Sequence, residues 1–206
     1  MNDITISLTN YNFIIPAGKN ILVLSNYRTG STALCNVLSK LTGYINYEEP
    51  FNPLCHSPGK QVAVLLKDFK KIIKLHPDHM PQKQYWHEVF ENSFIIGLHR
   101  ENFVHQLLSY IVAKKTNNWV QKTKKCDPVS LDWLTNENII TEAEWLADRC
   151  QQYKECRQLL DIELCYEQII VDLGASVFCI HNKISDYNET VARIETLLKN
   201  KYNYNE

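Results

Sequence analysis

One strand-like run that passes directly into a helical pattern constrains the fold of this 206-residue chain more than any other feature. Residues 20–25 read NILVLS, an unbroken apolar and β-branched run that is typical of a strand buried on both faces. After a short turn, residues 31–41 carry apolar side chains at helical spacing, and Gly43 follows as a helix C-cap would. The segment therefore predicts a buried parallel strand, a turn and a helix.

The same alternation continues along the chain without a repeat or linker, so we expect one domain over residues 1–206. Residues 1–18 predict a β-hairpin or edge, and residues 116–138, which show no clear period, predict a loop or lid. Further strands are expected at 62–66, 93–98, 162–166 and 177–181, and further helices at 81–92, 102–115, 142–160 and 188–199. This pattern predicts an α/β three-layer sandwich, with helices on both faces of a central, mainly parallel sheet. Ligands of such sheets bind beyond the carboxyl ends of the strands.

Charge and cysteine content narrow the classes of protein. The 22 basic and 23 acidic residues give a net charge of −1, which argues against a broad basic surface for nucleic acid. No apolar run approaches the length of a membrane span, so we expect no integral membrane segment. The seven cysteines are odd in number and form no C-x-x-C motif. Reduced thiols, a cytoplasmic location and no metal site are therefore expected.

The turn between the first buried strand and its helix reads YRTGST over Tyr27–Thr32. The first N–H groups of a helix have no partner within the helix, and the helix dipole adds positive charge there. A glycine-containing turn at this place can therefore cradle an anion. Ser31 and Thr32 add hydroxyl donors, and Arg28 adds a permanent positive charge. The alternative is that Thr29 or Ser31 merely caps the helix.

A nucleotide-binding P-loop, G-x-x-x-x-G-K-[ST], is the competing motif. Gly30 and Thr32 fit it, but Ser31 stands at the lysine position and Ser25 at the first glycine position. The side chain that would reach the β- and γ-phosphates is missing, so use of ATP by a nucleotide kinase is disfavoured.

The YRTGST string resembles the 5′-phosphosulfate-binding loop of sulfotransferases that use PAPS (3′-phosphoadenosine-5′-phosphosulfate), where it appears as PKSGTT or [YQ]R[ST]GST. The arginine form is closer to the bacterial and carbohydrate-type members. The resemblance implies a P-loop-like version of the predicted fold, and it assigns Tyr27 and the five residues after it to donor binding. Arg28 falls on the family's Lys/Arg, Thr29 on its Ser/Thr, Gly30 on its Gly, and Ser31 and Thr32 on its two hydroxyl residues.

A second motif lies at the strand expected at 93–98. Arg100 follows this strand, and Ser109 lies nine residues later on the next helix. The family binds the donor's 3′-phosphate with such a pair, and a guanidinium can grip a phosphate through two parallel bonds. Tyr166, in a string similar to Y-E-[DN]-L, and Lys183, in a string similar to K-S-x-x-D-Y, are weaker candidates for nucleotide contacts. The late Gly-rich loop of hormone and phenol sulfotransferases is absent, which leaves the contacts near the end of the chain open.

The resemblance implies transfer of a sulfuryl group from PAPS to a hydroxyl or amine, by in-line displacement that releases PAP (adenosine 3′,5′-bisphosphate), without a metal. Such a transfer depends on positioning and charge stabilisation more than on covalent chemistry by the protein. Arg28 would meet the charge on the leaving phosphate, and the N–H groups of residues 30–32 with the Thr32 hydroxyl would hold the sulfonate. The acceptor stays open among small molecules, glycans and lipids.

The group that takes the acceptor's proton has several candidates. Many sulfotransferases use a histidine at the end of the second strand, in a K-T-H context, but here that place reads LKDF at residues 66–69. Other branches use a glutamate soon after the first helix, where this chain reads YEEPFNP. We expect Glu49 to be the base, with Glu48 second, because two adjacent carboxylates can raise one pKa towards neutrality. His56 and His99 are next, and the alternatives are a solvated acidic turn, or a module that binds PAP without turnover.

Overall fold

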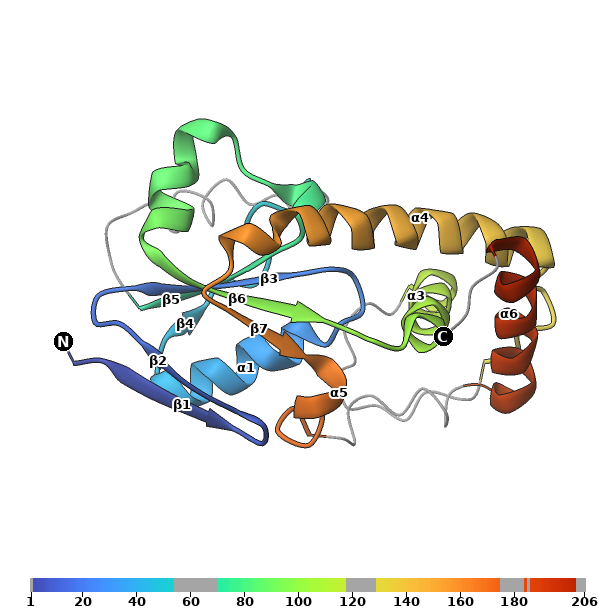
Figure 1. Ribbon diagram of the computed structural model, residues 1–206, viewed down its shortest axis with the longest axis horizontal. Coiled ribbons are helices and arrows are strands. Elements are labelled where there is room, and N and C mark those ends of the chain that lie inside the picture. Colours follow the sequence, from blue (N-terminus) through green and yellow to red (C-terminus); the bar gives the residue numbers. More distant parts are fainter. Residues whose placement is uncertain (1, 54–69, 118–128, 175–183, 185, 203–206) are drawn as a thin grey trace. The chain divides into compact units, whose positions relative to one another are not determined.

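The structure is a computed structural model that describes residues 2–53, 70–117, 129–174, 184 and 186–202 (Figure 1). The sequence predicts one domain, and the chain divides into two compact units. The first unit comprises Met1–Glu101 and Arg149–Gly174, and the second comprises Asn102–Asp148 and Ala175–Glu206.

The first unit is built on a five-stranded sheet in which every strand pairing is parallel. The centre of the sheet is β3 (Asn20–Ser25), whose residues are all buried, as its unbroken apolar run predicts. The expected α/β class with a parallel sheet is confirmed, and the carboxyl ends of β5, β3 and β6 are neighbours along one edge. The strands in spatial order are β4 (Ile45–Asn46), β5 (Lys71–Leu75), β3, β6 (Ser93–His99) and β7 (Ile162–Cys165).

Helix α1 (Ser31–Thr42) follows β3 through the YRTGST loop and packs against β3 and β5, on one face of the sheet (Figure 1). It ends as the sequence predicts. Gly43 adopts a left-handed φ of 72°, and its N–H donates to the Ser39 carbonyl at 2.9 Å. The loop is thereby fixed between a central strand and a helix that is stopped at a defined residue.

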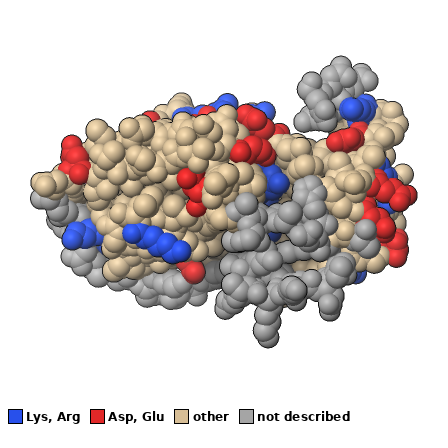
Figure 2. Space-filling model, turned by 90° about the horizontal axis from the view of Figure 1, so that it is seen from below, with Lys and Arg blue, Asp and Glu red and all other residues tan. Residues whose placement is uncertain are grey.

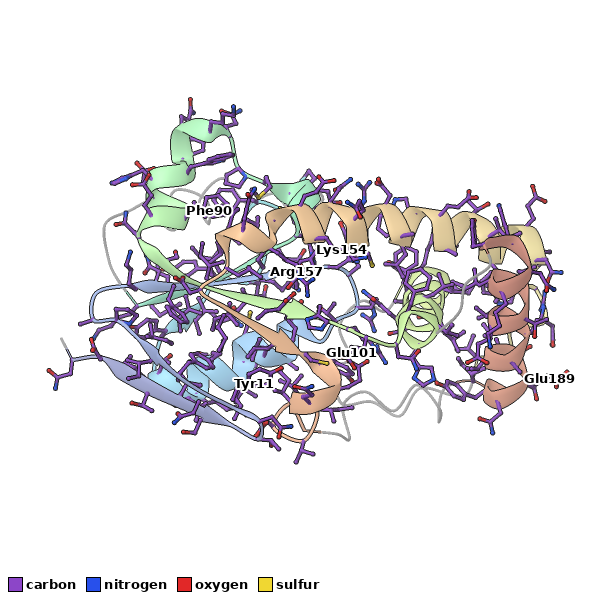
Figure 3. The ribbon with its side chains drawn as sticks, in the orientation of Figure 1. Tyr11, Phe90, Glu101, Lys154, Arg157 and Glu189 are labelled. Atoms are coloured by element: carbon purple, nitrogen blue, oxygen red, sulfur yellow. The ribbon has the colours of Figure 1, made fainter. Side chains whose placement is uncertain are left out.

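The expected N-terminal hairpin is present as β1 (Ile4–Leu8) and β2 (Tyr11–Ile15), which pair antiparallel in a separate two-stranded sheet. Tyr11 joins this hairpin to α5 (Tyr166–Ile169) (Figure 3). Its hydroxyl donates to the side chain of Gln168 at 2.7 Å and accepts the Cys165 N–H at 3.0 Å. The remaining short elements of this unit are η2 (Pro77–His79), η3 (Lys83–Tyr85), η4 (His87–Glu91) and η5 (Arg157–Leu159).

The second unit contains α3 (Phe103–Thr116), which packs against α6 (Tyr187–Tyr202). Asn102 caps α3, because its side chain accepts the His105 N–H at 2.9 Å. Helix α4 (Asn136–Cys156) begins in this unit and ends in the first.

The strand beside β3 is the main difference from the sequence prediction. The strand expected at 62–66 lies outside the described residues, and β3 pairs with β5, which reads KIIKL. Two lysines interrupt the apolar pattern of β5, yet Lys71 and Lys74 are only 3% and 8% exposed. Burial of Lys74 is possible because its ammonium group has a carboxylate and a hydroxyl as partners, described below.

Other expected elements differ in extent or type. The helix expected at 81–92 forms only the short turns η3 and η4, and the helix expected at 142–160 begins earlier, at Asn136. Residues 118–128 of the expected lid, and the strand expected at 177–181, lie outside the described residues.

Three features bear on the expectations drawn from the composition: the charged surface residues, the apolar character of the helices and the cysteines. On the face in Figure 2, basic and acidic side chains are interspersed among larger areas of other residues. Among the helices that the structure describes, none is long and apolar enough to cross a membrane. The cysteines whose environment is described are free: Cys35, Cys150, Cys156 and Cys165.

Candidate functional site

The YRTGST loop is held by its own hydrogen bonds. The Thr29 hydroxyl donates to the Asn26 carbonyl at 3.0 Å, so this buried side chain is used inside the loop. Gly30 is the N-cap of α1 and has a left-handed φ of 84°. A Cβ on Gly30 would lie 2.8 Å from the Tyr166 ring, so glycine is required both by the backbone and by the packing.

The start of α1 is uncapped by any side chain within the described part of the chain. The alternative interpretation, in which Thr29 or Ser31 serves only as a helix cap, is therefore wrong. The first N–H groups of α1 are left for water or a ligand. This is the property that an anion cradle needs.

Two arginines lie at this cradle. Arg28 has a left-handed φ of 59°, and its carbonyl accepts a hydrogen bond from Arg100 Nη1 at 3.3 Å. Burial, followed by the nearby charge of Arg100, lowers the pKa of Arg28 to about 10, so Arg28 is still charged at neutral pH. Two guanidinium groups thus lie close together at this loop, and guanidinium groups are well suited to contact phosphate or carboxylate oxygens.

Arg100 follows β6, where the sequence predicts it, and it is oriented by two residues of the segment after β7. Its Nε lies 3.4 Å from the Glu167 carboxylate. Its guanidinium lies over the buried Tyr166 ring, 4.6 Å from the ring centroid. Tyr166 therefore acts as a support beneath Arg100 and as the wall against Gly30.

On the other side of β3, Lys74 of β5 reaches the cradle. Its ammonium group donates to the Thr32 hydroxyl at 2.7 Å and forms an ion pair with Glu49. Glu49 also accepts a hydrogen bond from Asn52 Nδ2 at 2.5 Å and lies 3.5 Å from His76 Nε2. The cradle hydroxyl, the lysine, the carboxylate and the histidine thus form one polar network.

The pKa of Glu49 is shifted in the direction opposite to the one expected. Burial alone would raise its pKa, but the bond from His76 and the charge of Lys74 outweigh burial and hold the pKa well below its usual range. The expectation that an adjacent Glu48 would raise this pKa is therefore wrong. Glu48 is exposed, and its backbone carbonyl accepts the Lys74 N–H at 2.7 Å. Glu49 is a permanent carboxylate at neutral pH and a poor proton acceptor.

His76, which the sequence interpretation missed, lies directly after β5 and is 4% exposed. Its Nδ1 lies 2.7 Å from the Ser25 carbonyl, and its Nε2 faces Glu49. Both ring nitrogens thus face oxygen atoms, which fixes the orientation of the ring. The available signal was the string Lys74-Leu75-His76, a lysine and histidine two residues apart at a strand end. The sequence interpretation did not use it, because the second strand was expected at 62–66, nine residues before β5.

Of the remaining predicted site residues, the structure describes some and not others. Ser109 is a buried residue of α3 in the second unit, and Ser31 is a buried first residue of α1. His99 ends β6, and its Nδ1 lies 3.3 Å from the Glu163 carboxylate. Lys183, His56 and the LKDF segment at 66–69 lie outside the described residues.

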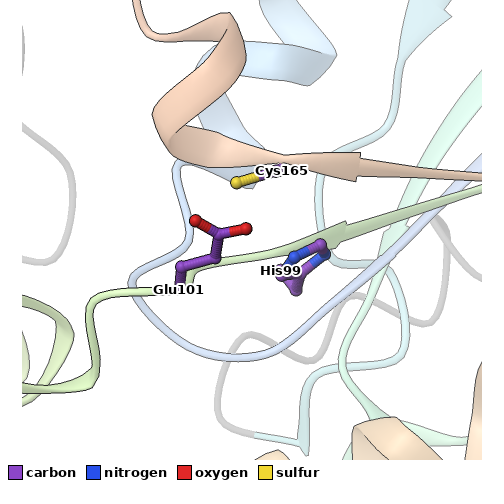
Figure 4. A group of neighbouring side chains, drawn as sticks. All are labelled: His99, Glu101 and Cys165. Atoms are coloured by element: carbon purple, nitrogen blue, oxygen red, sulfur yellow. The ribbon is translucent and has the colours of Figure 1, made fainter. Parts of the chain in front are cut away.

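One group of metal-ligating residue types does converge. His99, Glu101 and Cys165 lie at the ends of β6 and β7 with one potential ligand atom from each within 4.8 Å of the others (Figure 4). The Cys165 thiol donates to Glu167 at 3.3 Å, and burial together with this bond raises its pKa to about 11. The Glu101 N–H donates to the same Glu167 carboxylate at 3.1 Å, so Glu167 links two members of this group.

Comparison with known proteins adds no family to these observations. No family model matches the chain, and no curated protein is similar to it in sequence. Its function is therefore inferred from the loop and from the side chains that surround it.

Proposed function

We propose that this chain is a sulfotransferase that moves a sulfuryl group from PAPS to a hydroxyl or amine and releases PAP. One observation carries the proposal: the ends of three neighbouring parallel strands bring together the YRTGST loop, Arg100, and the pair Lys74 and His76. The loop resembles the family's 5′-phosphosulfate loop, and Lys-Leu-His at the end of β5 is similar to the family's K-T-H context. The P-loop-like form of the fold, with helices on both faces of the sheet, belongs to the same proposal.

In this proposal the cradle holds the donor's 5′ end. The uncapped N–H groups at the start of α1, with the hydroxyls of Ser31 and Thr32, bind the sulfonate and the 5′-phosphate. Arg28 stabilises the charge that grows on the 5′-phosphate oxygen as its bond to sulfur breaks. Lys74, which already contacts the Thr32 hydroxyl, adds positive charge beside the sulfonate.

Arg100 is the proposed ligand of the 3′-phosphate. Its position over Tyr166 and beside Glu167 fixes the guanidinium plane, which prepares it for a two-bond contact with a phosphate. Ser109, and with less support Lys183, are proposed as further contacts to the nucleotide from the family pattern.

His76 replaces Glu49 as the proposed base. As the acceptor oxygen attacks sulfur, its proton passes to His76 Nε2, and the sulfur–oxygen bond to the 5′-phosphate breaks. The Ser25 carbonyl keeps Nδ1 protonated and leaves Nε2 as the basic nitrogen. The fixed negative charge of Glu49 then stabilises the imidazolium that forms.

Donor binding and transfer test the proposal separately. In a thermal-shift comparison of PAP, ATP and GTP, PAP is expected to raise the melting temperature most, because a ligand that binds only the native state stabilises it. ³⁵S-labelled PAPS is then supplied with 2-naphthol, oligosaccharides of N-acetylglucosamine and a sterol, and labelled product is measured. Larger stabilisation by ATP than by PAP would refute the donor assignment. Stabilisation by PAP without labelled product would favour a binding module.

A further inference from the structure

Tyr27 has a role that its place in the loop motif does not suggest. The family pattern assigns it to donor binding, but its ring lies on the β5 side of the loop, stacked on the His76 imidazole. The ring centroids are 4.4 Å apart, with 12° between the planes. Such close, parallel contact restricts rotation of both rings.

The Tyr27 hydroxyl is anchored in turn. It donates to Asp78 Oδ2 at 2.9 Å, and the same Asp78 oxygen lies 3.6 Å from Arg149 Nε of α4. Burial, followed by the charge of Asp78, raises the pKa of Tyr27 far above neutrality, so the hydroxyl stays protonated and remains a donor.

His79 completes the anchor. Its Nε2 lies 3.0 Å from the Tyr27 hydroxyl oxygen, and its Nδ1 is buried with no hydrogen-bond partner among the described residues. Burial lowers the pKa of His79, which favours the neutral ring. Because the hydroxyl hydrogen is given to Asp78, the neutral ring is best placed with its proton on Nε2, donating to the tyrosine oxygen.

His76 is therefore held on three sides. The Ser25 carbonyl fixes Nδ1, Tyr27 covers one face, and the His79 ring meets it edge to face with 5.4 Å between centroids. A flip of the imidazole would place Cδ2 at the Ser25 carbonyl and Cε1 towards Glu49. Without the Tyr27 ring, this motion would meet less steric resistance.

We propose that Tyr27 is a positioning residue: its ring, anchored through the hydroxyl to Asp78 and His79, holds the His76 imidazole in the orientation that keeps Nδ1 at the Ser25 carbonyl and Nε2 on the side of Glu49. This inference rests on the proposed role of His76 in sulfuryl transfer. It differs from the family assignment in its consequence, because loss of the Tyr27 side chain should lower turnover and leave the donor's KM nearly unchanged.

The position of His76 can be read without any transfer reaction. In the ligand-free protein with ¹³C- and ¹⁵N-labelled histidine, the His76 ring signals are assigned from their loss in His76→Gln. Stacking on Tyr27 predicts an upfield ring-current shift of the His76 ring protons. Tyr27→Phe, which keeps the ring, should retain this shift, and Tyr27→Leu should abolish it. Tyr202→Phe, which removes an exposed tyrosine hydroxyl that donates to Glu144, is the matched control and should change nothing.

Kinetics with PAPS and 2-naphthol then separate positioning from donor binding. We expect Tyr27→Leu to lower kcat roughly 10- to 100-fold with less than about a threefold change in the KM for PAPS. Tyr27→Phe should recover most of this loss. A raised KM for PAPS with unchanged kcat, or a Tyr27→Leu spectrum in which the His76 signals do not move, would overturn the inference.

If neither the wild-type protein nor any variant transfers a sulfuryl group, the proposed function fails. The spectra still decide whether Tyr27 holds His76. If Tyr27→Leu does not fold, Tyr27→Phe decides: His76 ring protons that lack the upfield shift in this variant, or a raised KM for PAPS, would overturn the inference.

Discussion

The two strands that flank β3 place different sets of charged side chains beside the YRTGST loop. On the β5 side, the buried Lys74 and His76 and the half-buried Glu49 compensate one another through polar contacts. On the β6 side, Arg28 is buried close to the guanidinium group of Arg100, and Glu167 is the carboxylate that pairs with Arg100. The members of the first arrangement compensate one another, whereas two guanidinium groups lie near one carboxylate in the second.

This difference separates the expected roles of the two sides. A network whose members already satisfy one another is suited to fixing orientation and proton location, because it costs no reorganisation during the reaction. A site with concentrated positive charge is suited to binding phosphate or sulfonate. Substitutions on the β5 side should therefore change turnover, and those on the β6 side should change donor affinity.

The largest expected effect is that of His76→Gln, on the β5 side. Loss of a positioned base typically costs 10²- to 10⁴-fold, so turnover with the best acceptor should fall by roughly that range. PAP affinity, measured by titration calorimetry, should stay within about threefold of wild type. His87→Gln is the control, because His87 is an exposed histidine remote in sequence from the loop. Near-normal turnover in His76→Gln would remove His76 from the mechanism and reopen the choice among His56, His99 and a base-free reaction.

Arg28→Ala probes the point where the two sides meet. Arg28 is proposed to touch the bound donor and to meet charge that grows in the transition state. Turnover should therefore fall by roughly 10²- to 10³-fold, and PAP affinity should fall with it. Both quantities are measured on the same preparation, with circular dichroism to confirm folding. Loss of turnover with unchanged PAP affinity would move Arg28 away from the donor and contradict the cradle.

Arg100→Ala tests the β6 side alone. A charged hydrogen bond contributes about 1.5–3 kcal/mol, so PAP affinity should fall roughly 10- to 100-fold. Adenosine 5′-phosphosulfate, which lacks the 3′-phosphate, should bind the variant within about threefold of its affinity for wild type. Arg157→Ala is the control, since Arg157 of η5 is an arginine that already pairs with Glu163. Equal losses for both ligands would show that Arg100 does not recognise the 3′-phosphate.

The two sides of the YRTGST loop also differ in how far they could be predicted from the sequence. The loop and its flanking elements were predictable because their signals are local: the apolar run of β3, Gly30 in the turn, and Gly43 at the end of α1. Arg100 was likewise predictable, because it directly follows an apolar strand.

The β5 side was not predictable in the same way. Lys71 and Lys74 make β5 look like a surface segment, and the burial of Lys74 depends on Glu49 and Thr32, which come from other parts of the chain. The pKa of Glu49 depends on Lys74 and His76, which are distant in sequence, more than on its neighbour Glu48. Pairings of this kind are created by the register of parallel strands, which no local pattern reveals.

The smallest effect expected concerns stability, and it tests whether the β5 network is complete without a ligand. In Glu49→Gln, Lys74 and His76 lose a carboxylate partner, so the free energy of unfolding at pH 7 should fall by roughly 2 kcal/mol. The pKa of Glu49 is lowered in the folded state, so its contribution is fully present above the ordinary carboxyl pKa of 4.5 and is lost as the pH falls through the lower folded value. The difference in the free energy of unfolding between wild type and Glu49→Gln, measured with urea, should therefore be constant from pH 8 to pH 6. It should become smaller below about pH 4.5. Glu91→Gln removes an exposed carboxylate that pairs with His87, and it should change stability by less than about 0.5 kcal/mol at pH 7. Two results would mean that the β5 network does not hold itself together in the absence of donor. One is a stability difference between wild type and Glu49→Gln that increases in acid. The other is a Glu49→Gln variant that is as stable as Glu91→Gln at pH 7.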